Sequence, residues 1–482
     1  AITTTEWNGW VDEFRLSVGA ARSTSAYTSP QKAFDTEANG RCRGGFFARN
    51  TDGSITIFAA TSTRLFKLNN TNFGWIDVSK GGIAYSAVPS GANWRCVQFN
   101  KFVVCTQINT VPQVFDVSSS TAFADLGGSP PQAGGIAVVG RFLVLFNISG
   151  FPYKVKWSGL NSVITWTPGT LQSDEQDLSD GGRVLDVAGG DQFGVIFQES
   201  SIRSMVYVPG SPVIFEILRI ATNDGILATA CAISAGDTIF FISPQGFKKI
   251  VPGGYPEPIG KEKFDRTFFA ELDTANLQFL MAATDPTTTR VYWAYKSATG
   301  SASLFDKIIV YDRVLNRATV LNVTGEFLTG LARPGLTLEN MDTISGSLDA
   351  LPFSLDDISV SALVQLAMVG PTHAAGFFSG ANLEAVMETG EEGGNGRRIF
   401  VDSVRPQTDC PTAMISIGCF ETPQQADATF TTETAVDDTG DCSVDGGGID
   451  ARYAKVRLRC PAGAEWTYAM GVEPSVTITG AR

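Results

Sequence analysis

The feature that most constrains the fold of this chain is a recurring pair of short apolar runs separated by a polar or glycine-containing break. Between Arg141 and Asp265 the runs read RFLVLFN, YKVKWSGLNSVITW, FGVIFQESSIRSMVYV and DTIFFISPQGFKKIV. In these runs β-branched and aromatic residues alternate with polar ones, which is typical of strands and not of helices. Each pair of runs therefore predicts a β-hairpin, and no segment has the pattern of an amphipathic helix.

The hairpins recur at a nearly constant spacing. Six of them begin near Ser54, Lys101, Arg141, Phe193, Asp237 and Arg290. The intervals are 47, 40, 52, 44 and 53 residues, and a four-stranded propeller blade takes about 40–50 residues. A small-residue apolar segment, such as GGIAVVG or VLDVAGG, precedes most hairpins and suits the innermost strand of a blade. We therefore predict an all-β chain whose residues 41–345 form a β-propeller of about six blades, with β-sandwiches as the alternative.

The regular pattern ends after residue 328. A polar, turn-rich segment, SLDALPFSLDD, follows at 347–357, and short runs such as AMISIGCF and ARYAKVRLRC occupy the rest of the chain. We predict a domain boundary near residue 345 and a second β-rich domain over 346–482. Residues 1–40 are mixed and turn-rich, with Trp7 and Trp10 as anchors for another segment, and we expect them to pack on that second domain.

The charge is unevenly distributed along the chain. Residues 1–345 carry 28 Lys+Arg against 30 Asp+Glu, whereas residues 346–482 carry 8 against 19, which gives −11 of the total net charge of −13. An acidic surface argues against tight sequence-neutral binding to nucleic acid, which needs cations to displace counterions. No apolar run is long enough to span a membrane, and AITTTEWNGW lacks the pattern of a secretory leader, so we expect folding in a cytoplasm.

Eight cysteines give no metal-site signature. None forms a CxxC pair, and the first four, Cys42, Cys96, Cys105 and Cys231, lie singly in or beside predicted strands. We expect these four to be buried free thiols. The other four lie close together in the C-terminal region, and their spacing leaves the pairing open: Cys410, Cys419, Cys442 and Cys460.

The residues needed for common catalytic sites are scarce. His373 is the only histidine, which weighs against a Ser-His-Asp triad or a Cys-His pair, and we interpret it as structural. No phosphate-binding glycine loop of the GxxxxGK[ST] type occurs. Some propellers are glycosidases, and NTDGSITIF at Asn50–Phe58 is an imperfect match to the Asp box of sialidases, but a hairpin turn explains it better. We expect no enzymatic activity and no cofactor.

One acidic, glycine-rich stretch is a weak candidate for a calcium site. DDTGDCSVDGGGID at 437–450 lacks the spacing of an EF-hand, and a solvated turn is the simpler interpretation. The candidate ligands are Asp437, Asp438, Asp441, Asp445 and Asp450.

Several long stretches resemble a known family. VKWSGLNSVITW (155–166), DLSDGGRVLDVAGGDQFGVIFQESSIRSMVYV (177–208), PIGKEKFDRTFFAEL (258–272) and RYAKVRLRCPAGAEWTYAMGVEPSVTITG (452–480) are similar to the nozzle, or tail-hub, proteins of short-tailed bacteriophages (podovirus type). Together with SLDALPFSLDD, which also fits the family, these stretches extend the resemblance over most of Arg141–Arg482. The first 100 residues match only in general style.

The resemblance implies a structural virion protein and not an enzyme. Six copies would form a ring, through a platform-like β domain, below the portal and adaptor of the phage neck. Its channel would retain and then conduct the genome, and tail fibres or spikes would attach around it. We add the hypothesis that the acidic excess of 346–482 faces the channel, since it would repel phosphate. The alternative is a glycan-binding or glycan-cleaving propeller on a virion or cell surface.

The residues of the matching stretches have structural interpretations. We expect Trp157 and Trp166 to pack in the core or between blades, and Gly181-Gly182 and Gly189-Gly190 to form turns with positive φ. Glu199 and Arg203 are predicted to form an ion pair across a hairpin. Asp265-Arg266 is predicted to cap or bridge a turn. Asp177 and Gly260 are the remaining motif positions.

Overall fold

The structure is a computed structural model of the chain, and it describes most of the 482 residues. The described residues are 19–20, 40–69, 74–211, 213–261, 263–301, 303–332, 364–380, 382–393, 397–422, 425, 428–444 and 447–480. They form two compact units: the first contains the described residues from 40 to 377, and the second contains 19–20 together with the described residues from 378 to 480. Both are built mainly from antiparallel sheets, which confirms the all-β fold class.

The first unit contains six four-stranded sheets and one three-stranded sheet among its described residues. Sheet 1 is β2 (Gly44–Arg49), β3 (Ile55–Ala60), β4 (Leu65–Leu68) and β5 (Trp75–Asp77), and sheet 2 is β6 (Arg95–Phe99), β7 (Phe102–Gln107), β8 (Thr110–Asp116) and β9 (Ala124–Asp125). Sheet 3 is β10 (Ala133–Val139), β11 (Phe142–Ile148), β12 (Phe151–Trp157) and β13 (Asp174–Asp177), and sheet 4 is β14 (Val184–Ala188), β15 (Phe193–Gln198), β16 (Ser201–Tyr207) and β17 (Phe215–Thr222).

The remaining sheets of this unit follow in chain order. Sheet 5 is β18 (Ile233–Ala235), β19 (Thr238–Ser243), β20 (Gly246–Ile250) and β21 (Glu257–Pro258), and sheet 6 is β22 (Met281–Thr284), β23 (Arg290–Tyr295), β24 (Lys307–Asp312) and β25 (Arg317–Leu321). Sheet 7 is β26 (Phe327–Ala332), β27 (Val364–Val369) and β28 (Ala375–Phe377). Short helical turns connect some of them: η2 (Lys80–Gly82), η3 (Ser179–Gly181), α1 (Asp265–Glu271) and η4 (Leu277–Phe279).

Local sequence explains why these strands pair with their neighbours along the chain. Two-residue turns join β6 to β7 and β10 to β11, and their first residues, Asn100 and Gly140, have φ of 53° and 59°. Positive φ at this position matches the twist of a hairpin, and asparagine and glycine adopt it most readily. The second strands are the most apolar, and every residue of β3 is buried. The α1 helix was not predicted, because seven residues are too few to establish a helical period.

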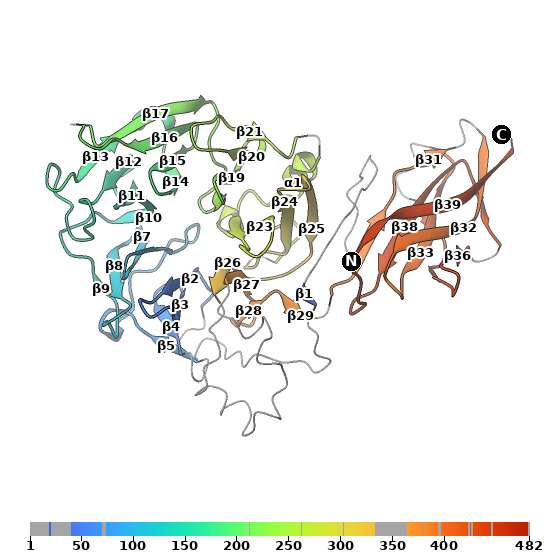
Figure 1. Cartoon of the computed structure of the whole chain (residues 1–482), viewed down its shortest axis with the longest axis horizontal. Helices are drawn as coiled ribbons and strands as arrows, with labels where there is room; N and C mark the ends of the chain where they lie inside the picture. The colour runs from blue at the N-terminus through green and yellow to red at the C-terminus, as the bar shows by residue number, and fades with distance from the viewer. Residues whose placement is uncertain are drawn as a thin grey trace, which may run out of the picture. The chain divides into compact units, whose positions relative to one another are not determined.

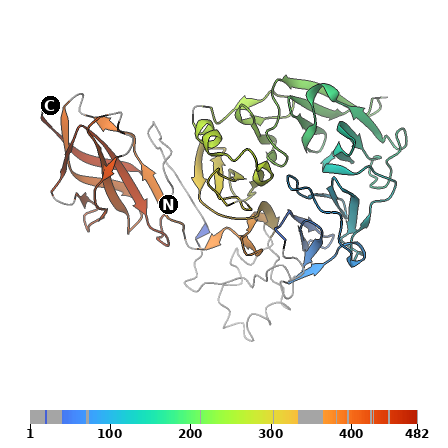
Figure 2. The same ribbon diagram turned by 180° about the vertical axis from the view of Figure 1, so that it is seen from behind.

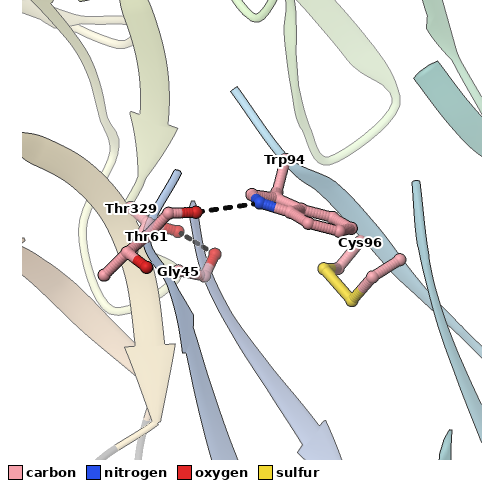
Figure 3. Close-up of a disulfide and its surroundings, with 6 residues drawn as sticks. Gly45, Thr61, Trp94, Cys96 and Thr329 are labelled. Carbon is pink, nitrogen blue, oxygen red and sulfur yellow. Dashed lines mark hydrogen bonds between the residues drawn. A yellow bond between two sulfur atoms is a disulfide. The ribbon is translucent and has the colours of Figure 1, made fainter. Parts of the chain in front are cut away.

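Consecutive sheets of the first unit lie side by side. The first strands β2, β6, β10 and β14 follow one another, and β26 lies between β22 and β2. Figures 1 and 2 show the first strands toward the middle of this unit, with β13, β17 and β25 toward its outside. Sheet 1 is linked to both its neighbours: Trp94 Nε1 donates to Thr61 O (2.9 Å), and Thr329 Oγ1 donates to Gly45 O (3.4 Å; Figure 3).

The six predicted hairpin units correspond to sheets 1 to 6, but the end of the predicted first domain is wrong. Sheet 7 is built from β26 and from β27 and β28, which lie beyond residue 345, so the unit extends to Phe377. Residues 333–363 separate β26 from β27, and this long interval breaks the regular spacing on which the prediction depended. SLDALPFSLDD lies outside the described residues.

The second unit packs two sheets against each other. One contains β30 (Ala385–Glu388), β38 (Tyr453–Cys460), β33 (Met414–Phe420) and β34 (Thr429–Phe430), with β31 (Glu392–Gly393) on β38 and β35 (Thr434–Ala435) on β33. The other contains β36 (Cys442–Ser443), β32 (Arg398–Thr408), β37 (Ile449–Ala451) and β39 (Ala469–Gly480). Apolar side chains of β32, β33 and β38 form their shared core. This unit includes β1 (Gly19–Ala20), which pairs in parallel with β29 (Ser379–Gly380).

The N-terminal segment was expected to pack on the C-terminal domain. The β1–β29 pairing is the described contact that bears on this expectation. Trp7 and Trp10 lie outside the described residues. In the part of the chain that the structure describes, no helix is both long enough and apolar enough to cross a membrane.

Candidate functional site: the central polar cluster

Polar side chains from non-neighbouring sheets meet in the middle of the first unit. Arg95 begins β6 of sheet 2, and its guanidinium forms an ion pair with Asp186 of β14 in sheet 4. Sheet 3 lies between these sheets in the chain order, so the pair is possible only where the first strands converge. Asp186 is 1% exposed, and its other carboxylate oxygen accepts the backbone N–H of Ala230, which leads into sheet 5, at 3.0 Å.

Two more contacts cross the same region and end on the η4 turn before sheet 6. Asn93, which precedes sheet 2, donates from Nδ2 to the carbonyl oxygen of Gln278 at 3.1 Å. Arg41, which precedes sheet 1, has its guanidinium carbon 3.9 Å from the centre of the Phe279 ring. Such stacking of a guanidinium on an aromatic face is attractive, and more so when desolvated. We call Arg41, Asn93, Arg95 and Asp186 the central polar cluster.

Arg41 is the least satisfied member of the central polar cluster. Burial, followed by repulsion from Arg43, lowers the pKa of Arg41 from 12.5 to about 10. Its Nε and one terminal nitrogen are buried and find no acceptor among the described residues. The Oδ1 atom of Asn93 is likewise buried without a donor from the described part of the chain. Buried polar groups are nearly always hydrogen-bonded in proteins. Three of the five buried side-chain atoms without a hydrogen-bond partner among the described residues belong to Arg41 and Asn93.

A second polar group joins the last sheet to the segment before the first. Glu326, 3% exposed, accepts the backbone N–H of Cys42 at 2.8 Å, and its other oxygen lies 2.8 Å from His373 Nδ1, without the angles of a hydrogen bond. His373 lies in the turn between β27 and β28, with φ of 62°. Burial raises the pKa of the Cys42 thiol to about 12, so it is an inert thiol. We call Glu326, His373 and Cys42 the closing group.

The two tryptophans of the matching stretch 155–166 are buried, as predicted. Trp157, at the end of β12, is 3% exposed, packs edge-to-face on Phe215 and donates to Gln172 O at 2.9 Å. Trp166 is 2% exposed and lies in a core cluster shared by sheets 2 and 3. Asp177 ends β13, and its carboxylate lies 3.4 Å from Lys154 Nζ on the paired strand. All three have structural surroundings.

The predicted Glu199–Arg203 ion pair is wrong. Glu199 lies in the turn after β15 and pairs with Arg183 at 2.7 Å. Arg203 lies opposite Ile196 on the neighbouring strand, and its side chain extends to Asp180 and to Gln198 Oε1. The two side chains therefore start at different positions along the hairpin and reach different partners.

Of the two glycine pairs predicted to have positive φ, Gly181-Gly182 has it at one position and Gly189-Gly190 at neither. Gly182 has φ of 80°, as predicted. Gly181 is not in the left-handed region; a Cβ there would lie 2.2 Å from Ser201 Oγ and 2.3 Å from Gln198 Oε1. At Gly189 a Cβ would lie 1.8 Å from the carbonyl oxygen of Val138, where sheets 3 and 4 approach each other. The prediction of positive φ is wrong for Gly181, Gly189 and Gly190, and close packing explains the first two.

Asp265 bridges a turn, as predicted. It begins α1, and its Oδ1 accepts the backbone N–H of Phe247 in β20 at 3.1 Å. A Cβ on Gly260 would lie 1.9 Å from the same oxygen, so glycine makes room for the carboxylate. Burial raises the pKa of Asp265 above its usual value. Arg266 is exposed on α1.

The acidic loop of the second unit does not gather its carboxylates around one point. Asp437 accepts the backbone N–H groups of Thr439 (2.8 Å) and Asp441 (3.0 Å) within its own turn. Asp441 and Asp450 pair with different arginines, Arg405 and Arg398. Asp438 is exposed, and Asp445 lies outside the described residues. Among the residues that were described, no group of three or more His, Cys, Asp or Glu is placed to hold a metal ion.

Two of the cysteines expected to be free thiols are bonded to each other. Cys96 in β6 and Cys105 in β7 are directly opposite and form a disulfide with Cα atoms 4.1 Å apart (Figure 3). Neither residue belongs to a CxxC or other spaced motif, so the pairing followed from strand register and had no signal in the sequence. The free cysteines are Cys42, Cys231, Cys410, Cys419, Cys442 and Cys460.

The central polar cluster and Glu326 were missed at the sequence level. Asp186 carried the clearest signal, because it is the one charged residue inside VLDVAGG, an otherwise apolar first strand. Arg41, Asn93 and Arg95 lie just before or at the start of first strands, where a polar residue is unremarkable. These side chains meet in the middle of the unit only because sheets that are distant in the chain pack together.

Comparison with known proteins leaves the family open. No protein-family model and no curated protein matches the chain. Among solved structures, a candidate 6-phosphogluconolactonase from Bacteroides fragilis matches with 12% identity and a TM-score of 0.36, over 64% of this chain and 87% of that one. A functionally unknown protein from Desulfotomaculum acetoxidans matches with 11% identity and a TM-score of 0.35, over 56% and 82%.

A third solved structure covers more of this chain. The extracellular domain of a candidate one-component system from B. thetaiotaomicron matches with 9% identity and a TM-score of 0.39, over 86% of this chain and 50% of that one. Identities and scores this low carry no argument about function.

Proposed function

We propose that the first unit is a seven-bladed β-propeller, with sheets 1 to 7 as its blades. The supporting observation is the set of contacts that skip sheets. Arg95 of sheet 2 meets Asp186 of sheet 4, and Arg41, before sheet 1, meets Phe279, before sheet 6. β26 also lies beside both β22 and β2, as the last blade of a closed ring must. Closure removes the open sheet edges that favour aggregation.

We further propose that the chain is a structural protein of a phage tail, the nozzle or tail hub. The observation that carries this proposal is the likeness of the long stretches at 155–166, 177–208, 258–272 and 452–480 to that family. The architecture is compatible with it, since an all-β first unit is followed by a separate all-β unit. In this proposal the protein is made in the host cytoplasm, resides in the virion tail, and has neither catalytic activity nor a cofactor.

The conduit of such a nozzle would lie between copies and not within one. Side chains of the central polar cluster meet in the middle of the first unit, and this leaves no passage of the width of a DNA duplex there. We propose that six copies surround the channel, bind the portal-adaptor ring above and carry tail fibres or spikes outside. The genome would pass through without stable binding, and no copy would insert stably into a membrane.

Acidic side chains of the second unit provide the charge that this conduit needs. Many described acids there pair with arginine or lysine, for example Glu388 with Lys455 and Arg457. Asp438 and Glu465 are exposed and have no ion pair with a described residue, so they are among the acids that would repel DNA phosphates. Charge reversal at Asp438 and Glu465 should slow genome ejection. Reversal of exposed Asp191 in the first unit is the control, and equal ejection kinetics in all particles would refute the charge hypothesis.

The experiment that tests the proposed function is the oligomeric state of the purified chain and its place in particles. We expect electron-microscope class averages to show a hollow six-fold ring, alone or on an adaptor. A ring at the foot of a phage portal would establish the nozzle. A chain that stays monomeric, is absent from virion necks and binds oligosaccharides would instead establish the glycan-binding alternative.

A further inference from the structure

We propose that Arg41, Asn93 and the η4 turn form a binding site for a small oxyanion, the chemistry shared by phosphate and carboxylate groups. The guanidinium of Arg41 lies over the Phe279 ring, and two of its nitrogens are buried without an acceptor among the described residues. Removal of a charge from water is costly unless a counter-charge is present. The planar donors of arginine match two oxygens of one phosphate or carboxylate group.

The nearby acidic side chains form no ion pair with Arg41, although the charge of Glu326 offsets part of the lowering of its pKa. Asp186 is committed to Arg95 and to the backbone N–H groups of Val187 and Ala230. Glu326 is committed to the backbone N–H of Cys42 and to His373. Neither carboxylate lies within ion-pair distance of Arg41 among the ion pairs of the described residues. The missing partner of Arg41 is therefore expected from outside the described chain.

The other basic side chain beside Arg41 is already occupied. Arg43 donates from one terminal nitrogen to the carbonyl oxygens of Pro89 at 2.6 Å and Ala92 at 3.1 Å. Its charge still repels Arg41 and contributes to the lowered pKa of Arg41. An anion would be attracted to both guanidinium groups but would receive hydrogen bonds from Arg41, whose donors are free of described partners.

Asn93 adds a hydrogen-bond acceptor to the proposed site and so narrows the kind of oxyanion expected there. It contacts the same turn as Arg41, because its Nδ2 donates to Gln278 O, next to Phe279. Its Oδ1 is a buried acceptor without a described donor. An oxyanion that also carries an O–H group, such as hydrogen phosphate, can accept from Arg41 and donate to Asn93, whereas acetate can only accept. The site should therefore bind phosphate more tightly than acetate.

The test is a titration of the full chain with inorganic phosphate, and separately with acetate, at constant ionic strength. Calorimetry and thermal unfolding should both report saturable phosphate binding, with a weaker response to acetate. Arg41→Met should weaken phosphate binding at least about tenfold, since a charge-assisted pair is lost. It should also raise the thermal midpoint of the phosphate-free chain, because an unpaired buried charge is removed. Arg266→Met, at an exposed position, is the control and should change neither result.

A second variant keeps the test decisive if Arg41→Met does not fold. Asn93→Asp places a carboxylate beside the η4 turn that Arg41 also contacts, so it should attract Arg41 and abolish the phosphate response. Phosphate binding that is unchanged in both variants would mean an adventitious ion only, and no phosphate response in the wild-type chain would overturn the proposal. These outcomes are independent of the ring experiment, because the site lies within one copy.

Discussion

The two units differ in how their strands find partners. In the first unit every four-stranded sheet pairs strands that are consecutive in the chain, as β10 to β13 do. In the second unit the long strand β32 pairs with β39, so that Arg398 lies opposite Gly480, and β38 pairs with β30. Local hairpins can be recognised from alternation and turn residues, whereas distant pairings cannot. The comparison explains why the sequence predicted the first unit in more detail.

The two units also differ in what fills and covers their sheets. The first has large aromatic side chains between sheets, such as Phe247 against Trp293 at 5.0 Å. The second has a core of mainly aliphatic residues and cysteines with one tryptophan, Trp466, and arginine–carboxylate pairs on its surface. We therefore expect truncation of core side chains to cost most in the first unit. Both units carry carboxylates whose pKa is lowered by hydrogen bonds from cationic side chains, for example Glu175 in the first and Glu433 in the second, so both should lose stability in acid.

The largest expected effect is on the packing of the first unit. Trp293→Ala should lower its free energy of unfolding by about 3–5 kcal/mol, the usual range for a fully buried tryptophan. Trp293 is completely buried, and its Nε1 donates to Cys231 O at 3.1 Å. Denaturant unfolding followed by circular dichroism measures the change. Trp293→Phe, which keeps a ring, should lose less; an equal shift in the transition of the second unit would mean that the units unfold together.

The next effect concerns the disulfide, which has no counterpart among the described cysteines of the second unit. The two cysteines are nine positions apart in the sequence. A disulfide that closes a loop of this length lowers the conformational entropy of the unfolded chain and so stabilises the folded state by about 2–3 kcal/mol. Cys96→Ser should therefore lower the stability of the first unit by about that amount under oxidising conditions. The wild-type chain after reduction, verified by mass, should match the variant. Equal stability of oxidised and reduced wild type would contradict the expectation.

The third effect is the pH dependence of the second unit. Hydrogen bonds from Arg459 lower the pKa of Glu433, and those from Arg398 lower the pKa of Glu421. A carboxylate whose pKa is lower in the folded state stabilises the protein above its unfolded pKa, near 4.5, and this contribution is lost as the pH falls through the folded value. The thermal midpoint should therefore drop below about pH 4.5, and Glu433→Gln should reduce that drop. Glu465→Gln, at an exposed position, should not.

Asp265 in the first unit should act in the opposite direction to these carboxylates. Burial raises its pKa, so its contribution favours folding most at pH values below the unfolded pKa and declines as the pH rises through the folded value. Asp265→Asn should remove this dependence in the same pH series. A pH profile of the first unit that is the same in the wild-type chain and in Asp265→Asn would contradict this expectation.

The smallest expected effect is at the acidic loop of the second unit. Asp441→Asn should change stability by less than about 0.5 kcal/mol, because its pair with Arg405 is largely exposed. Calcium should leave the thermal midpoint of the wild-type chain unchanged. A calcium-dependent rise that is lost in Asp441→Asn would restore the loop as a metal site.

The sequence by itself determined the strand content, the six hairpin units and the burial of Trp157 and Trp166. These features depend on local alternation, turn residues and side-chain size, which act between residues close in the chain. The structural role of Asp265 was predictable for the same reason, since its partners Phe247 and Gly260 belong to the same sheet and the turn beside it.

Only the tertiary structure decided which distant groups meet. Sheet 7, the Cys96–Cys105 bond and the ion pairs of Glu199 and Arg203 depend on strand register and sheet order. The central polar cluster depends on still more, because Arg95 reaches Asp186 only after sheets 2, 3 and 4 have packed. The sequence around one residue does not indicate such a partner, because the distance between the two residues depends on the number and curvature of the sheets that separate them in the chain.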